Sequence, residues 1–302
     1  MDIVLYALTA FLYAGLCLAD WRAWRQRARL MPMAHDGASL PAAPGMNVWR
    51  RALLLIALLA HGVLLHMMIF AQHEMVFGFA FALSAMFWLG AVIYWVESFF
   101  FALDGLRLML LPLAAVAALL PLMFGGVRVL PYAATPIFRL HFLIANAAYG
   151  FFAIAALHAV LMLAVERRLH ALAPMAGVNG AVSGARVRGW FTGWLETLPP
   201  LLTLEKCLFR LLRVGFVLLT LTLASGILFS TQVNGRLLSL DQKTVFSMLA
   251  WLMFGALLTA RRLSGWRGRA ALRWVLASFV ALLLAYVGSH FVFEVLLHRP
   301  VV

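Results

Sequence analysis

Long hydrophobic segments alternate along the chain with shorter segments that carry most of the charged residues. A hydrocarbon core about 30 Å thick is crossed by roughly 20 apolar residues in a helix. Eight segments are candidates for such spans, at approximately 3–19, 52–70, 76–98, 106–124, 139–165, 208–232, 244–260 and 271–296. The pattern therefore predicts an all-α fold, a polytopic membrane helix bundle with about eight transmembrane helices.

The first hydrophobic segment lies close to the N-terminus and could be mistaken for a signal peptide. It has Asp2 where a signal peptide has basic residues, and no small-residue cleavage site follows it. We therefore expect this segment to be a retained helix.

Basic residues gather in alternate connections between the spans, as the positive-inside rule expects. Five of the 24 lysines and arginines lie at one end of the spans: Arg128 and Arg139 between the fourth and fifth, Arg236 and Lys243 between the sixth and seventh, and Arg299 after the eighth. The other 19 lie at the opposite end: Arg22, Arg25, Arg27, Arg29, Arg50, Arg51, Arg107, Arg167, Arg168, Arg186, Arg188, Lys206, Arg210, Arg213, Arg261, Arg262, Arg267, Arg269 and Arg273. Eight spans then place both termini on the outer, periplasmic side. The net charge of +13 thus indicates membrane topology, and we expect no nucleic-acid partner.

Composition agrees with a membrane protein and narrows the chemistry. Hydrophobic residues make up 65% of the chain and charged residues 12%, against about half and a quarter in soluble domains. Cys17 and Cys207 form no C-x-x-C motif. This excludes thiol–disulfide exchange, Cys-type zinc sites and covalent attachment of c-type haem to this chain.

We interpret residues 1–302 as a single integral membrane domain. Its longest predicted non-spanning stretch, at about 166–207, contains MAGVNGAVSGARVRG and is expected to be a mobile cytoplasmic loop. Trp190 and Trp194, near the end of that stretch, suit a helix at the inner membrane interface.

Histidine is the ionisable residue that recurs within the predicted spans, as His61, His66, His141, His158 and His290. The rise of about 1.5 Å per helical residue places His66, His141 and His290 at a similar outward depth, with His298 nearby. Neutral imidazoles from two helices can together hold one haem iron. The simpler interpretation of a single buried histidine is a hydrogen bond to a neighbouring backbone group or to a Ser or Thr side chain, and we expect such a structural role for His61 and His158.

Residues 204–251 read LEKCLFRLLRVGFVLLTLTLASGILFSTQVNGRLLSLDQKTVFSMLAW. They align without a gap to the pattern LDxLxYRxIxxGFxxLTxGIxxGAVWAxxxWGxYWSWDPKETWxLxTW. The matching positions are Arg210, Gly215, Phe216, Leu219, Thr220, Gly226, Gly235, Ser239, Asp241, Lys243 and Trp251. The chain thereby resembles the cytochrome c assembly protein family of the CcsA/CcmC type over about residues 60–298.

Two shorter motifs extend this resemblance. RLHFLIANAAYG is similar to the family's outer histidine segment, and makes His141 the counterpart of an external haem ligand. AYVGSHFVFEVLLH is similar to the family's last helix, and makes His298 the nearest counterpart of the second external ligand. The resemblance therefore implies haem as the cofactor, with iron held by His141 and His298, and with His290 also at this depth.

The same resemblance implies that Asp241 and Lys243 belong to an outer segment that faces haem. Lys243 could pair with a haem propionate or with Asp241. From the residues alone, Asp241 is equally suited to cap the N-terminus of the helix that follows it, and the two roles are compatible.

The chain also departs from the family pattern. Leu238 and Leu240 replace the two tryptophans of the WWD core, so the aromatic surface on which haem stacks in the family is missing. Thr259 stands where the family has a histidine near the inner end of a helix. These departures make the chain more similar to the YpjD/HemX-like branch than to a haem-delivering synthetase.

Two hypotheses follow for a multi-pass protein of the bacterial inner membrane. The first is a haem-handling or cytochrome c biogenesis accessory protein that binds haem non-covalently on its outer face. The alternative is a non-haem membrane scaffold or regulatory partner, linked to haem synthesis or cation transport. The expected partners are the lipid bilayer and other cytochrome c maturation or membrane proteins. We find no nucleophile–base pair, paired carboxylates or phosphate-binding glycine loop, and expect no enzymatic activity.

Overall fold

The computed structural model describes residues 2–30, 46–69, 75–76, 78–124, 129–130, 136–172, 200–234 and 242–285. Within these ranges the chain forms eight helices: α1 (Asp2–Leu30), α2 (Val48–Ile69), α3 (Phe79–Glu97), α4 (Asp104–Met123), α5 (Pro136–Leu172), α7 (Leu201–Asn234), α8 (Gln242–Ser264) and α9 (Arg269–Leu283). Seven of these, all except α9, are long and apolar enough to cross a membrane. The prediction of a polytopic helical membrane bundle is confirmed.

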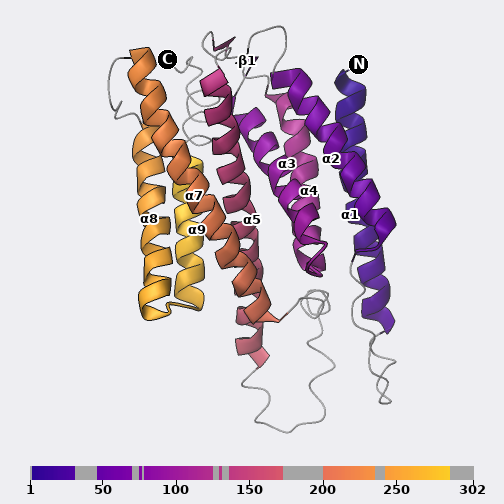
Figure 1. The fold of residues 1–302 in the computed structure, drawn as a ribbon. Helices are drawn as coiled ribbons and strands as arrows, with labels where there is room; N and C mark the ends of the chain where they lie inside the picture. Colours follow the sequence, from indigo (N-terminus) through magenta and orange to yellow (C-terminus); the bar gives the residue numbers. More distant parts are fainter. Residues whose placement is uncertain are drawn as a thin grey trace.

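The helices run up and down alternately, and α5 joins two groups of them (Figure 1). On one side α1 packs against α2 and α4, and α3 packs against α2 and α4. On the other side α8 packs against α7 and α9. The central helix α5 contacts α3 and α4 as well as α7 and α9. The bundle end at which α1 starts, and toward which α9 runs, is called the outer end below, and the opposite end the inner end.

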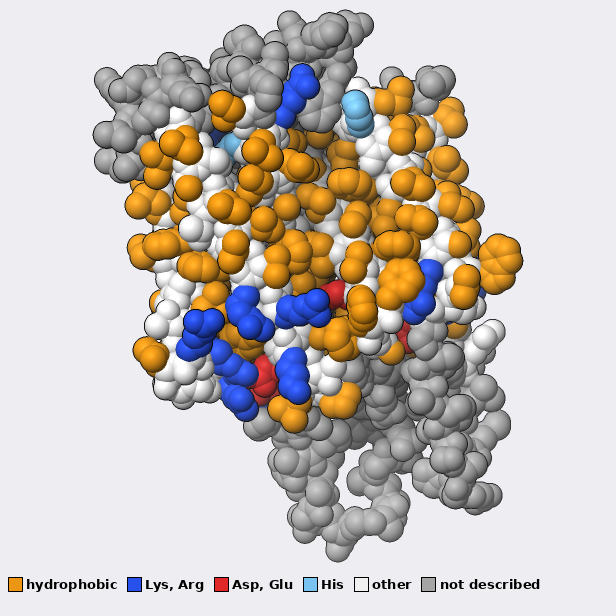
Figure 2. Space-filling model, viewed as in Figure 1, with side chains coloured by type: hydrophobic (Ala, Val, Ile, Leu, Met, Phe, Trp, Pro, Cys, Tyr) orange, Lys and Arg blue, Asp and Glu red, His pale blue; other side chains and the backbone are white. Residues whose placement is uncertain are grey.

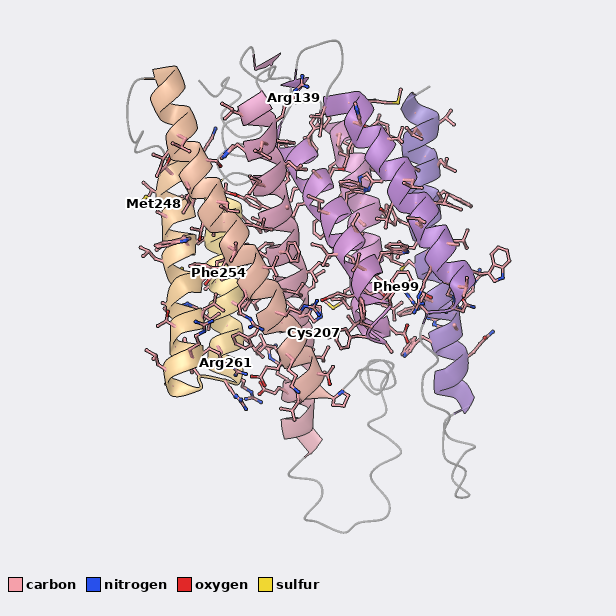
Figure 3. The ribbon with its side chains drawn as sticks, viewed as in Figure 1. Phe99, Arg139, Cys207, Met248, Phe254 and Arg261 are labelled. Atoms are coloured by element: carbon pink, nitrogen blue, oxygen red, sulfur yellow. The ribbon has the colours of Figure 1, made fainter. Side chains whose placement is uncertain are left out.

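Basic side chains are concentrated at the inner end of the bundle (Figure 2). Within the described ranges only Arg139 and Lys243 flank the outer end, at the starts of α5 and α8. Arg139 and Arg261 mark the two ends in Figure 3. This distribution is the one that the positive-inside rule requires if the inner end faces the cytoplasm.

Several helix boundaries differ from those predicted. The first helix continues to Leu30, well beyond the predicted 3–19, and its apolar span is Ile3–Gln26. The stretch predicted as a loop at 166–207 is helical at both ends, because α5 continues to Leu172 and α7 starts at Leu201. The rest of that stretch, with Trp190 and Trp194, lies outside the described residues, as does the end of the last predicted span beyond residue 285.

Past position 19, helix α1 carries a buried carboxylate that is paired with arginines of two other helices. Asp20 is 4% exposed and accepts two hydrogen bonds from Arg107 of α4, from Nε at 2.5 Å and from Nη2 at 2.8 Å. Arg50 of α2 lies 3.2 Å from the same carboxylate, and Asp104 lies 3.1 Å from Arg107. The two acids and the two arginines of this cluster neutralise one another, so α1 can pass Asp20 through the bundle without leaving an unpaired buried charge.

Small residues bring α3, α5 and α7 close together in the core. A Cβ at Gly150 of α5 would lie 2.8 Å from the Cβ of Leu89 in α3, closer than real Cβ atoms approach. Close approach of this kind is a common way for membrane helices to pack. Deeper in the bundle, the rings of Phe152 and Phe254 stack with their centroids 4.0 Å apart, and both side chains are fully buried.

A two-residue antiparallel pair links two connections at the outer end. Strand β1 (Met75–Val76) pairs with β2 (Val129–Leu130). The pair joins the connection between α2 and α3 to the connection between α4 and α5.

Candidate functional site

His141 lies in the first turns of α5, at the outer end, where α5 faces α7. Its Nδ1 is 2.8 Å from Oγ of Ser225 in α7, and the side chain is half-buried. The next residue of α7, Gly226, also lies against the imidazole, and a Cβ there would be in van der Waals contact with it, 3.4 Å from Cε1 of His141.

The hydrogen bonds around Ser225 bear on which imidazole nitrogen of His141 carries the proton. Oγ of Ser225 lies 3.1 Å from the backbone carbonyl of Thr222, which can only accept. The Ser225 hydroxyl has one hydrogen, which goes either to Nδ1 of His141 or to this carbonyl. In the second arrangement Ser225 Oγ accepts from Nδ1–H of His141. In a neutral imidazole this leaves the lone pair on Nε2, which is the form that binds a metal.

Of the other predicted site residues, only Lys243 lies within the described part of the chain. Lys243 is the second residue of α8 and is half-buried. Asp241 immediately precedes Gln242, the first residue of α8. The side chain of Asp241, together with His290, His298, Leu238 and Leu240, lies outside the described residues. The convergence of these groups on His141 therefore stays a prediction.

His61 has the structural role expected for it. It is fully buried, with Nε2 2.9 Å from Oγ of Ser84 and Nδ1 3.3 Å from the hydroxyl of Tyr13. Both ring nitrogens therefore have partners, one as donor and one as acceptor. Gly62 allows α2 and α3 to approach closely beside His61, because a Cβ there would lie 2.9 Å from the Trp88 ring.

His158 is also fully buried, but only one of its nitrogens is satisfied. Nδ1 donates to the carbonyl of Ile154 in the preceding turn, at 3.0 Å. Nε2 has no hydrogen-bond partner within the described part of the chain. Within the same part, no three His, Cys, Asp or Glu side chains are grouped so that they could hold a metal ion.

An outer pocket of about 590 Å³ lies between α2, α3 and α5. It was not predicted from the sequence. Most of its lining is apolar, and its polar members are His66, Arg139 and Asn146. His66 was placed correctly at outward depth, but no sequence pattern indicated that it shares a cavity with Arg139. His141 does not line this pocket, because it faces α7 from another side of α5. His66 and His141 therefore do not face one common cavity.

Comparison with known proteins identifies the family. The model of the cytochrome c assembly protein family matches residues 49–297. The chain belongs to the cytochrome c assembly protein family. Helix α1 precedes the matched region, so the buried cluster at Asp20 joins this helix to the family core.

Curated relatives match over shorter stretches. The inner membrane protein YpjD of Escherichia coli K12 is 37% identical over 99 residues, which are 32% of this chain and 36% of that protein. A 28.8 kDa protein of Azospirillum brasilense is 39% identical over 100 residues, 33% of this chain and 37% of that protein. The cytochrome c biogenesis protein CcsA of Gloeobacter violaceus is 33% identical over 89 residues, which are 30% of this chain and 26% of that protein. The matches thus span only about a quarter to a third of these relatives. No solved structure matches the chain.

Proposed function

We propose that this protein handles haem at the outer face of a bacterial inner membrane, as an accessory factor in cytochrome c biogenesis. The family match and the relatives called CcsA and YpjD support this assignment. In this proposal the protein acts by holding haem and not as an enzyme, and its partners are the bilayer and other cytochrome c maturation proteins.

The observation that carries the proposal is the hydrogen-bonded state of His141. The hydrogen bond to Ser225 orients the ring, and in the arrangement in which Ser225 donates to Thr222 the imidazole is the Nδ1–H tautomer. An axial histidine of haem requires a free Nε2 lone pair and a fixed ring, and a hydrogen bond at the other nitrogen supplies both. The residues present therefore fit a haem ligand. We assign the first iron ligand to His141, the second to His298 with His290 as its neighbour, and propionate contact to Lys243 beside Asp241. Bound haem would supply an iron centre with histidine ligation at this face.

The test is absorption spectroscopy of the purified full-length protein, before and after addition of haemin. We expect a Soret band whose position indicates histidine ligation, its loss in His141→Ala, and its recovery when free imidazole is added to that variant. His158→Leu, which removes a histidine far inside the core, serves as the matched control and should retain the band. Absence of haem uptake by the wild type, or an unchanged spectrum in His141→Ala, would contradict the proposal.

A second function is favoured by Leu238 and Leu240, which stand where the family pattern has the two tryptophans. Without that aromatic surface the chain could serve as a non-haem scaffold or regulatory partner of another membrane complex. In that case His141→Ala would leave the cellular phenotype intact, while deletion within residues 173–199 would abolish co-purification of a partner protein.

A further inference from the structure

A groove with a cavity volume of about 1070 Å³ lies between α7 and α8 at the inner end of the bundle. It is separate from the proposed haem site, because His141 and Lys243 lie at the outer end. Figure 2 shows Lys and Arg side chains over the lower halves of α7 and α8, with a hydrophobic surface directly above them. The groove therefore combines a basic part and an apolar part.

The basic part carries positive charge that the described part of the chain does not neutralise. Lys206 and Arg213 of α7 and Arg262 of α8 line the groove, and no described carboxylate lies within ion-pair distance of them. Glu205, the one acid among the described lining residues, is engaged by Arg261 and Arg267. An anion bound here would meet three exposed cations.

The apolar part continues from these cations toward the middle of the membrane. Phe216 and Trp251 line it, and their rings stack with centroids 5.7 Å apart. The Trp251 indole N–H is already used, since it donates to Oγ1 of Thr220 at 2.9 Å. Trp251 stands eleven positions before Arg262 in α8, a rise of about 16 Å. This is roughly half of the hydrocarbon thickness, so the apolar part has the depth of one acyl leaflet.

We propose that this groove binds an anionic phospholipid of the inner leaflet, with its phosphate at Lys206, Arg213 and Arg262 and an acyl chain against Phe216 and Trp251. Basic pockets between membrane helices on the cytoplasmic side are suited to acidic headgroups. A small soluble anion would leave the apolar part unfilled. Among the described residues that line the groove there is no His, Cys or Met, and Thr259 is one of them, so a haem here would find none of the usual protein ligands for its iron among them.

Native mass spectrometry of the full-length protein in detergent tests the proposal, with phosphatidylglycerol and phosphatidylcholine as titrated lipids. We expect one phosphatidylglycerol to bind in preference to phosphatidylcholine. The combined variant Lys206→Gln, Arg213→Gln and Arg262→Gln should bind phosphatidylglycerol about a hundredfold more weakly than the wild type. This figure follows from a loss of about fivefold in affinity for each charge removed. The matched control is Arg22→Gln, Arg167→Gln and Arg273→Gln, which removes three exposed charges from the same end without touching the groove. It should bind like the wild type.

A second variant retains every charge and fills the apolar part. A Cβ at Gly255 would already lie 3.4 Å from the Phe216 ring, so Gly255→Leu projects into the groove beside it. We expect this variant also to lose phosphatidylglycerol. Equal binding of the two lipids by the wild type would overturn the proposal, as would equal effects of the two triple variants. Displacement of phosphatidylglycerol by haemin, or by inorganic phosphate alone, would overturn it as well, because the groove would then belong to a porphyrin or to a free anion. None of these outcomes depends on haem at His141.

Discussion

Removing one partner from the buried cluster of Asp20 and Arg107 should cost far more stability than removing a partner from an exposed ion pair. The two side chains are 4% and 5% exposed and are joined by two hydrogen bonds. Breaking such a pair from one side costs about 3–5 kcal/mol, because it leaves a buried charge without its counter-ion. In Asp20→Asn the arginine retains Asp104, so we expect a loss at the lower end, about 3 kcal/mol. In Arg107→Met the carboxylate retains only Arg50, which is 31% exposed, and the loss should approach about 5 kcal/mol.

The measurement is SDS-induced unfolding of the purified protein in mixed micelles, followed by tryptophan fluorescence and far-UV circular dichroism. Asp20→Asn combined with Arg107→Met should cost at least about 1 kcal/mol less than the sum of the single changes, because the two side chains interact directly. Glu166→Gln is the control. It weakens a pair with Arg269 in which the side chains are 24% and 39% exposed, and should cost no more than about 1 kcal/mol. Single losses below about 1 kcal/mol in the buried pair, or strict additivity, would refute the reasoning.

Further predictions concern the core and use the same unfolding assay. His61→Phe should cost about 1–3 kcal/mol because it leaves the buried Ser84 hydroxyl without its partner. His158→Leu should cost less, because it removes only a hydrogen bond to the Ile154 carbonyl one turn earlier in the same helix, and Nε2 of His158 has no described partner to lose. Similar losses in the two variants would contradict this contrast. Gly150→Ala should cost about 1–3 kcal/mol, since its Cβ would lie 2.8 Å from that of Leu89. A Gly150→Ala protein as stable as the wild type would show that α3 and α5 separate without cost.

The sequence predicted the spans well because bilayer thickness imposes a strong length requirement on apolar helices. Boundaries were less accurate, and α1 shows why. The predicted span ended at residue 19, one position before Asp20, and hydrophobicity along one segment does not include a counter-ion supplied by another helix. Arg107 is 87 residues away, and no local pattern reports that partner.

The candidate site was predictable to a similar degree. Depth and motif placed His141 at the outer end of α5, where the structure has it. The contact with Ser225 could not be predicted, because it depends on the rotation of α5 against α7. The same limit applies to the inner groove, since its lining comes from two helices whose facing sides become known only from their packing.

The buried carboxylate in α1 also has a consequence for biosynthesis. Ribosomes add roughly 5–20 residues per second, so Arg107 emerges several seconds after Asp20 has been synthesised. During that interval Arg50, which is closer in sequence and also contacts Asp20, is the first arginine of the cluster to become available. Membrane insertion of the hairpin of α1 and α2 should therefore be completed in two stages. Arg50 of α2 pairs with Asp20 of α1 first, and Arg107 completes the buried cluster when α4 has been inserted.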